Sequence, residues 1–202
     1  MSEESIKAFS GDVRMTTEPL QVKMKICLVG DGAVGKTSLI RRYVLNEFTD
    51  RYLQTMGTKV TKKELDMKHP QTGEDIHVDM AIWDIIGQRA FRKLLQEAYF
   101  HGAKGMFGVC DLTRDYTLEG LNEWTESVRD VAGDVPLLVV GNKTDLQDDI
   151  QIGEERLKEL AGGNDASCLL TSAKTGEYVE IAFVRMAEKV LKAHPLEKLE
   201  IQ

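Results

Sequence analysis

The sequence predicts an α/β domain built on a mostly parallel sheet of six strands, one of them antiparallel, with about five helices on the two faces. Apolar runs bounded by turn residues recur along the chain. Most of these runs are separated by segments whose apolar residues repeat every three or four positions, as in helices. The run at residues 137–140 is apolar throughout. Such a strand is covered on both faces, as happens when crossover helices flank a parallel sheet.

The expected strands and helices alternate along the chain, with one exception. We expect strands at residues 22–29, 58–67, 76–83, 105–111, 135–140 and 168–170, and helices at residues 37–46, 90–100, 118–132, 154–161 and 177–193. Residues 69–73 are too few for a crossover helix and are typical of a hairpin, so the second strand is expected to run antiparallel to the third. Residues 1–20 are expected to form a tail or short accessory element, residues 21–194 one domain, and residues 195–202 a C-terminal tail.

The composition is that of an ordinary soluble globular protein. A chain of 202 residues suits a single domain, and 42% hydrophobic with 29% charged residues argues against disordered, fibrous and membrane classes. The net charge of −7 disfavours binding to nucleic acid, and no nucleic-acid partner is expected. A ring of backbone N–H groups can still bind a phosphorylated ligand, because it attracts an anion regardless of the total charge.

The cysteines and the chain ends predict a cytoplasmic protein. Cys27, Cys110 and Cys168 are odd in number and lie in apolar runs, which favours buried reduced thiols over disulfides. The sequence begins Met-Ser-Glu-Glu, with acid where a signal peptide carries base, and no run approaches the ~18 apolar residues of a membrane span. It lacks Gly after Met1 and ends Leu-Glu-Ile-Gln without a cysteine box, so we expect no lipid anchor of its own. We also expect a monomer.

A glycine-rich segment between the first expected strand and helix matches the phosphate-binding pattern G-x-x-x-x-G-K-[ST]. It consists of Gly30, Asp31, Gly32, Ala33, Val34, Gly35, Lys36 and Thr37 and is followed by Ser38. Glycines let the loop curl until successive N–H groups point at phosphate oxygens, and the helix adds its positive end. Lys36 is expected to bridge the outer two phosphates, and Thr37 to coordinate magnesium. A chance match in a chain of this length has a probability of roughly one in a hundred.

A second motif, Asn142-Lys143-Thr144-Asp145, predicts which base is bound. It lies at the carboxyl end of an apolar strand, where nucleotides bind in open α/β sheets. The carboxylate of Asp145 accepts hydrogen bonds from the ring N–H and the exocyclic amine of guanine, whereas adenine presents an acceptor at the corresponding ring position. Asp145 is therefore expected to select guanine. Taken alone, the motif is short enough for a polar strand-to-helix loop to explain it; its order and context favour the nucleotide.

Two further motifs complete a family resemblance. Asp84-Ile85-Ile86-Gly87-Gln88 fits the pattern D-x-x-G followed by glutamine, and Thr171-Ser172-Ala173-Lys174 fits an S-A-K base loop. With four motifs in this order, residues 22–193 resemble the small GTPases of the Ras superfamily. Their overall sequence pattern is most similar to the Rab branch. The resemblance implies a P-loop GTPase domain that binds GTP or GDP with Mg²⁺ and acts as a conformational switch.

The resemblance also implies a role for each matching residue. Phe48 would pack edge-on against the guanine. The Thr55 hydroxyl would reach magnesium and its N–H the terminal phosphate, so that loss of this phosphate releases the first switch. Asp84 would hold a magnesium-bound water, and Gly87 would donate its N–H to the same phosphate. The base and its loop would be fixed or supported by Asn142, Lys143, Ser172, Ala173 and Lys174.

Hydrolysis is expected to depend on Gln88. Phosphoryl transfer to water needs a nucleophile held in line, which we assign to Gln88, and charge stabilisation, to which magnesium and Lys36 contribute. Hydrolysis is expected to be slow without an activator, as it is in Ras. Effector, activator and exchange proteins would bind through residues 48–57 and 84–98.

The second switch departs from the usual family pattern D-T-A-G-Q-E, because Ile85 and Ile86 replace Thr-Ala and Arg89 replaces Glu. Loss of this acid puts the docking of the usual partners in doubt. Arg89, and with weaker support Arg51, is a candidate for lending positive charge to the transition state, although a solvated arginine is the interpretation we favour. Two rival functions remain open: a nucleotide-loaded binding module with negligible hydrolysis, and an ATP-dependent phosphotransferase, against which Asp145 argues.

The other distinctive side chains are interpreted as structural. Trp83 and Trp124 are expected to anchor the core. The four histidines lack the spacing of metal ligands, so no histidine metal site is expected.

Overall fold

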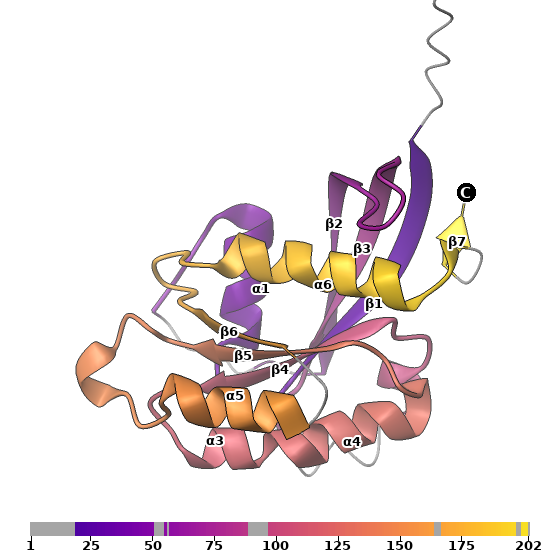
Figure 1. The fold of residues 1–202 in the computed structure, drawn as a ribbon. Helices are drawn as coiled ribbons and strands as arrows, with labels where there is room; N and C mark the ends of the chain where they lie inside the picture. The colour runs from indigo at the N-terminus through magenta and orange to yellow at the C-terminus, as the bar shows by residue number, and fades with distance from the viewer. Residues whose placement is uncertain are drawn as a thin grey trace, which may run out of the picture.

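A computed structural model describes residues 19–50, 55, 57–88, 97–163, 167–196 and 199–201. Strands and helices alternate as expected (Figure 1). In chain order the elements are β1 (Leu20–Val29), α1 (Lys36–Leu45), β2 (Thr58–Lys68), β3 (Asp75–Ile85), β4 (Gly105–Asp111), α3 (Tyr116–Glu119), α4 (Leu121–Ala132), β5 (Leu137–Asn142), the 3-10 helix η1 (Gln147–Asp149), α5 (Glu154–Gly163), β6 (Ser167–Thr171), α6 (Val179–Ala193) and β7 (Glu200–Ile201). Residues 97–100 are helical, and the rest of the expected helix 90–100 lies outside the described residues.

The sheet has the strand order β2-β3-β1-β4-β5-β6, and within this path every neighbouring pair except β2 with β3 is parallel. The predicted six-stranded, mostly parallel sheet and its antiparallel hairpin are therefore confirmed. Strands β3 and β4 lie on opposite sides of β1. The carboxyl end of β1 is thus the point at which the direction of chain progression changes, and ligands of open α/β sheets bind at such points.

A short seventh strand adds a pairing that the sequence did not predict. β7 lies in the segment expected to be a C-terminal tail and pairs antiparallel with β1, with Ile201 opposite Val22. Strand β4 pairs with residues 26–29 of β1, so the N-terminal half of β1 extends beyond β4 and offers its backbone groups to another strand. β7 takes part of that edge, because paired backbone groups are favoured over buried unpaired ones.

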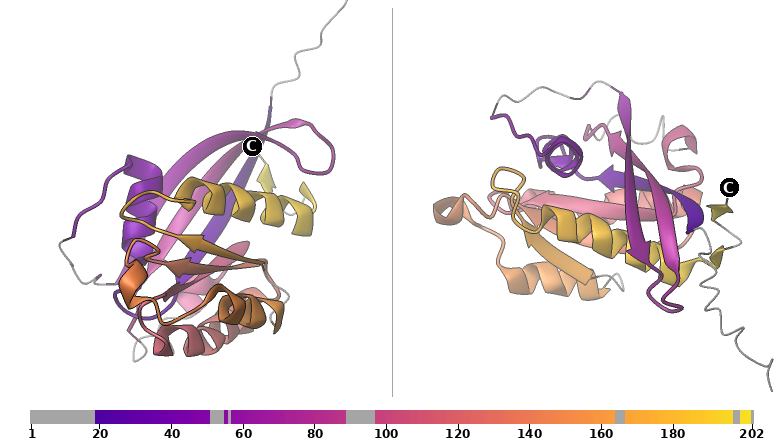
Figure 2. Two further views of the ribbon diagram at one scale, coloured as in Figure 1. Left: turned by 60° about the vertical axis from the view of Figure 1, so that its left-hand side comes forward. Right: turned by 90° about the horizontal axis from the view of Figure 1, so that it is seen from above.

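Helices cover both faces of the sheet, as predicted (Figures 1 and 2). The side chains of β1 alternate between two cores, as the period of a strand requires. Met24, Ile26 and Leu28 belong to a core with α1 and α6, whereas Cys27 and Val29 belong to a core with α3, α4 and α5. Both faces of β1 are therefore apolar, which is why the strand shows no polar alternation at its carboxyl half.

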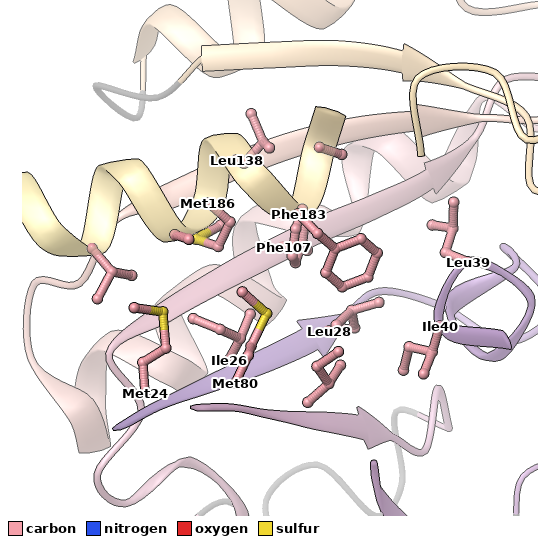
Figure 3. Close-up of a cluster of buried hydrophobic side chains, with 14 of the residues drawn as sticks. Met24, Ile26, Leu28, Leu39, Ile40, Met80, Phe107, Leu138, Phe183 and Met186 are labelled. Carbon is pink, nitrogen blue, oxygen red and sulfur yellow. The ribbon is translucent and has the colours of Figure 1, made fainter. Parts of the chain in front are cut away.

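The core beneath α6 fixes the helix that begins at the phosphate loop. Phe183 and Met186 of α6 point towards the side chains of β1 in Figure 3. The ring of Phe183 also stacks on Tyr43 of α1, with centroids 4.1 Å apart and planes 2° from parallel. Burial of each such side chain contributes about 1.5–3 kcal/mol. α1 is thereby held rigidly against the sheet, and so is the loop from which it starts.

One expected helix is divided. The segment 118–132 was expected to form a single helix, but α3 ends at Glu119 and α4 begins at Leu121, with Gly120 between them. Glycine weakens a helix by about 1 kcal/mol relative to alanine, so a break at this position is understandable. Within the described ranges, no helix is long and apolar enough to cross a membrane.

Candidate functional site

The four sequence motifs meet where the parallel strands end. A cavity of about 410 Å³ opens between them, a size within the roughly 300–1,000 Å³ of ordinary ligand pockets. Its lining includes most of the residues predicted from the sequence: Gly32, Ala33, Gly35, Lys36, Thr37, Ser38, Phe48, Thr55, Gly87, Gln88, Asn142, Lys143, Asp145, Ala173 and Lys174. Residues that are far apart in the sequence are thus brought to one concave surface.

Five predicted site residues are not among the described residues that line the cavity. They are Gly30, Asp31, Val34, Asp84 and Ser172, and each contacts a residue of the wall through a hydrogen bond or a chain neighbour. The lining also includes residues that were not predicted to contact the nucleotide or the metal: Arg41, Thr49, Asp50, Ile85, Ile86 and Leu146. Arg51 and Arg89, the two candidate transition-state arginines, lie outside the described residues.

The phosphate loop needs glycine for steric reasons as well as for its backbone angles. Gly35 has φ 101°, and a Cβ at this position would overlap the Asn142 side-chain amide. Gly87 approaches the loop from the second switch, and a Cβ there would lie 2.6 Å from the Asp31 carbonyl. These two positions allow three separate chain segments to close around the same space.

Lys36 is buried at the start of α1. Its ammonium group donates to the carbonyls of Gly30 at 2.6 Å and Asp31 at 2.8 Å. Burial lowers the pKa of Lys36 to about 8, although the charges of Asp84 and Asp31 oppose the change. An anion bound in the cavity would favour the charged form, because an opposite charge nearby offsets the desolvation of an ammonium group.

Three oxygen-bearing side chains meet beside Lys36. The Thr37 hydroxyl donates to Oδ2 of Asp84 at 2.5 Å and lies 3.1 Å from the Thr55 hydroxyl. Oδ1 of Asp84 is buried, and no donor in the described part of the chain reaches it. Burial also raises the pKa of Asp84, against the opposing effects of Thr37 and Lys36.

This donor set fits a magnesium ion. Mg²⁺ takes hard oxygen ligands and is usually bound by one or two protein groups together with waters and substrate phosphates. Two hydroxyls and one carboxylate oxygen without a partner are the groups that such an ion would satisfy.

The base loop is joined to the phosphate loop by Asn142. Its amide nitrogen donates to the Val34 carbonyl at 2.9 Å, and its amide oxygen accepts from the Ala173 N–H at 3.1 Å. In the same loop, the Ser172 hydroxyl donates to Oδ1 of Asp145 at 2.6 Å. This hydrogen bond orients the Asp145 carboxylate within the cavity wall, and leaves its other acceptor positions available to a ligand.

Lys143 takes an uncommon backbone conformation, with φ 78°. Its ammonium group donates to Oδ2 of Asp111 at 2.6 Å. Asp111 ends β4 and is fully buried. The base loop is therefore tied to the neighbouring strand β4.

Sequence reasoning missed several residues that support the site. Arg42 of α1 donates to the carbonyls of Ala173 and Lys174. Trp124 lies in the core as predicted, but its indole N–H also donates to Oδ1 of Asp31 at 2.9 Å. These contacts join residues 93 or more positions apart, and no local pattern signals them; a lone arginine on a helix and a buried tryptophan have ordinary explanations.

The replacements in the second switch are partly explained by packing. Ile85 ends β3 and is 2% exposed in the core that includes α4. Ile86 follows it and lines the cavity. Ile85 thus belongs to the core and also lines the cavity beside Ile86, and both side chains are apolar.

The fold and the cavity define a phosphate-loop nucleotide-binding protein of the small GTPase class. The Ras family model matches residues 25–192. The chain is 34% identical over 175 residues to Ras-related protein Rab-21 of Geodia cydonium, covering 86% of this chain and 73% of that protein. It is 34% identical over 170 residues to human Rab-8B, with coverages of 83% and 78%. It is 31% identical over 174 residues to mouse Rab-15, with coverages of 86% and 79%.

The chain therefore belongs to the Ras family. It is a Rab-like small GTPase of the Ras superfamily, a GTP-binding switch protein that hydrolyses GTP to GDP.

Proposed function

We propose that residues 21–194 bind GTP and GDP together with Mg²⁺, hydrolyse GTP slowly, and present two switch segments to effector and regulator proteins. The observation that carries this proposal is the meeting of the Thr37 and Thr55 hydroxyls and the Asp84 carboxylate beside a buried lysine. Oδ1 of that carboxylate has no hydrogen-bond partner among the described residues. An uncompensated buried carboxylate oxygen is costly in a folded protein, so its retention at this place favours a bound cation.

The phosphates are proposed to lie against residues 30–38. The N–H groups at the start of α1 have no partner within the helix and carry its positive end, so they attract the anion. Lys36 would add its charge to the outer two phosphates. Thr37, Thr55 and Asp84 would hold Mg²⁺, with Asp84 acting through a water; the ion, when bound, neutralises negative charge on the phosphates.

The guanine is proposed to occupy the other end of the cavity. Asp145 would accept from its ring N–H and exocyclic amine, and the Ala173 N–H and Lys143 stem would fix its edge and face. Phe48 lines the cavity and packs against the core below α6. Its ring would contact the base edge-on, as the resemblance to the small GTPases implies.

The switch is proposed to work through Thr55 and Gly87. Both line the cavity, and they belong to the segments 48–57 and 84–98. The first segment leads into β2 and the second follows β3, at the end of the hairpin where Thr58 pairs with Ile85. If both contact the terminal phosphate, its loss removes a shared partner and frees both segments. Effectors, activators and exchange proteins would then distinguish the two nucleotide states at this surface. Residues 51–54, 56 and 89–96 of the two segments lie outside the described residues.

Gln88 is proposed to orient the attacking water. It lines the cavity next to Gly87, where an amide can both donate to and accept from a water in line with the terminal phosphate. Gln88→Leu is therefore expected to lower the single-turnover rate of GTP hydrolysis at least about tenfold, with GTP binding unchanged, because positioning of the nucleophile is lost.

Hydrolysis by the Gln88→Leu variant is compared with that of the parent protein and of Gln71→Leu, an exposed glutamine in the β2–β3 hairpin. Equal rates for Gln88→Leu and the parent protein would contradict the role of Gln88. Negligible hydrolysis by all three proteins would favour the alternative of a nucleotide-loaded binding module.

A further inference from the structure

The outer side of the phosphate loop is held by side chains that do not line the cavity. Arg114, between β4 and α3, donates from Nη2 to the Gly32 carbonyl at 3.2 Å. Trp124 holds the neighbouring Asp31 carboxylate from the same side. Of these two braces, Arg114 carries a charge and contacts the backbone of the loop itself. Its role was not evident from the sequence, because it belongs to none of the four motifs.

Arg114 is fixed on three sides. Its Nε donates to Oδ2 of Asp111 at 2.7 Å, and its Nη1 donates to the Tyr116 hydroxyl at 2.9 Å, while Nη2 reaches Gly32. A planar guanidinium group with each nitrogen engaged has little freedom to rotate. Lysine has a single ammonium group and cannot reproduce this geometry.

Asp111 connects Arg114 to the base loop. The same oxygen, Oδ2, accepts from Arg114 and from Lys143, whereas Oδ1 accepts from the backbone and hydroxyl of Thr113. Burial alone would raise the pKa of Asp111, but the hydrogen bonds from Lys143, Thr113 and Arg114 outweigh it and hold the pKa below its usual value. The charged Asp111 carboxylate therefore pairs with two basic side chains: Arg114, which contacts the phosphate loop, and Lys143 of the base loop.

We propose that Arg114 is a positioning residue of the nucleotide site. Through Gly32 it holds the phosphate loop in its binding shape, and through Asp111 it couples that loop to Lys143 of the base loop. The inference deepens the proposed function and rests on guanine-nucleotide binding at this cavity. Arg114 acts without touching the nucleotide, since the described lining of the cavity does not include it.

The positive charge of Arg114 also favours nucleotide binding. Its guanidinium group contacts the backbone of Gly32, a residue that lines the cavity. Its positive charge is therefore felt inside the cavity, where it favours bound phosphate. Loss of Arg114 should weaken phosphate binding more than recognition of the base.

The test uses the full chain loaded with a fluorescent analogue of GDP. Release is followed after adding excess GDP, and the ³¹P NMR spectrum of bound GDP is recorded for the same proteins. In Arg114→Gln, release should accelerate roughly tenfold, as expected for loss of a hydrogen-bonded charge, and the β-phosphorus resonance should shift. Arg156→Gln is the matched control, because Arg156 pairs with Asp115 at the surface and does not contact the phosphate loop.

Arg114→Lys separates geometry from charge, and serves as a second variant if Arg114→Gln does not fold. It should release GDP several-fold faster than the parent protein, because an ammonium group cannot serve Asp111 and Gly32 together. If Arg114→Lys released GDP at the rate of the parent protein, the positioning role would be overturned, since positive charge alone would then be enough to retain the nucleotide.

The inference also fails if Arg114→Gln releases GDP within about twofold of Arg156→Gln, a margin close to the scatter expected of surface substitutions. It fails equally if Arg114→Gln lowers thermal stability but leaves the β-phosphorus resonance in place, which would indicate a purely structural role. A parent protein that retains no guanine nucleotide would instead overturn the proposed function, and with it this inference; that result is recognisable before any variant is compared.

Discussion

Asp145→Asn is expected to lower the affinity for GTP and GDP by roughly ten-thousandfold, the discrimination typical of sites that hydrogen-bond a buried polar edge. Asp145 lines the cavity, and its carboxylate is oriented by the Ser172 hydroxyl at 2.6 Å. A carboxylate accepts both N–H donors on the guanine edge, whereas an amide presents N–H groups to at least one of them. A guanine N–H donor that is desolvated in the cavity without a partner is costly, so changing one atom of the Asp145 side chain causes a large loss of affinity.

The same substitution should improve binding of xanthine nucleotides, because xanthine has a carbonyl where guanine has its exocyclic amine. Competition of GDP and xanthosine diphosphate for the Asp145→Asn protein measures this exchange of preference. Asp148→Asn, an exposed aspartate of η1, is the control and should behave as the parent protein. Unchanged GDP affinity in Asp145→Asn would mean that the base is read elsewhere.

Asp84→Asn is expected to reduce Mg²⁺-stimulated hydrolysis of GTP by about a hundredfold or more, given the several kcal/mol that a bound cation supplies to phosphoryl transfer. The neutral amide keeps an acceptor for Thr37 but removes the charge that would hold a magnesium-bound water. The hydrolysis rate is measured over a range of Mg²⁺ concentrations, with Asp130→Asn, an exposed residue of α4, as the matched control.

The metal-free, nucleotide-free Asp84→Asn protein should be more stable than the parent. Burial raises the folded-state pKa of Asp84 above its unfolded value. Ionisation of Asp84 therefore destabilises the folded protein as the pH rises through the unfolded pKa, and this cost persists at neutral pH unless a cation offsets it. Thermal unfolding measures the change. A less stable variant with undiminished Mg²⁺ dependence would contradict a metal role for Asp84.

Much of the fold was accessible from sequence because the signals are local. The apolar run at residues 137–140 indicated a strand covered on both faces, and β5 has those residues buried between β4 and β6. The short turn at residues 69–73 indicated a hairpin, and β2 and β3 pair antiparallel. The four motifs each carry their own pattern, so their meeting at one cavity followed once the strands were placed.

What the sequence did not reveal depends on contacts between distant segments. Arg114 and Trp124 contact the phosphate loop and Asp111 contacts the base loop, yet each is separated from its partner there by more than 30 positions. β7 depends on how far β1 extends beyond β4. The break at Gly120 reflects a helix propensity that tertiary packing often overrides, so a single glycine was not a sufficient signal.

The most direct test is calorimetry of the purified, nucleotide-stripped chain with GTP, GDP, ATP and ADP in the presence of Mg²⁺. Guanine nucleotides are expected to bind at least about a thousandfold more tightly than adenine nucleotides, because only guanine satisfies the Asp145 carboxylate. Equal affinities for guanosine and adenosine nucleotides would contradict the assignment of this cavity as a guanine-nucleotide site.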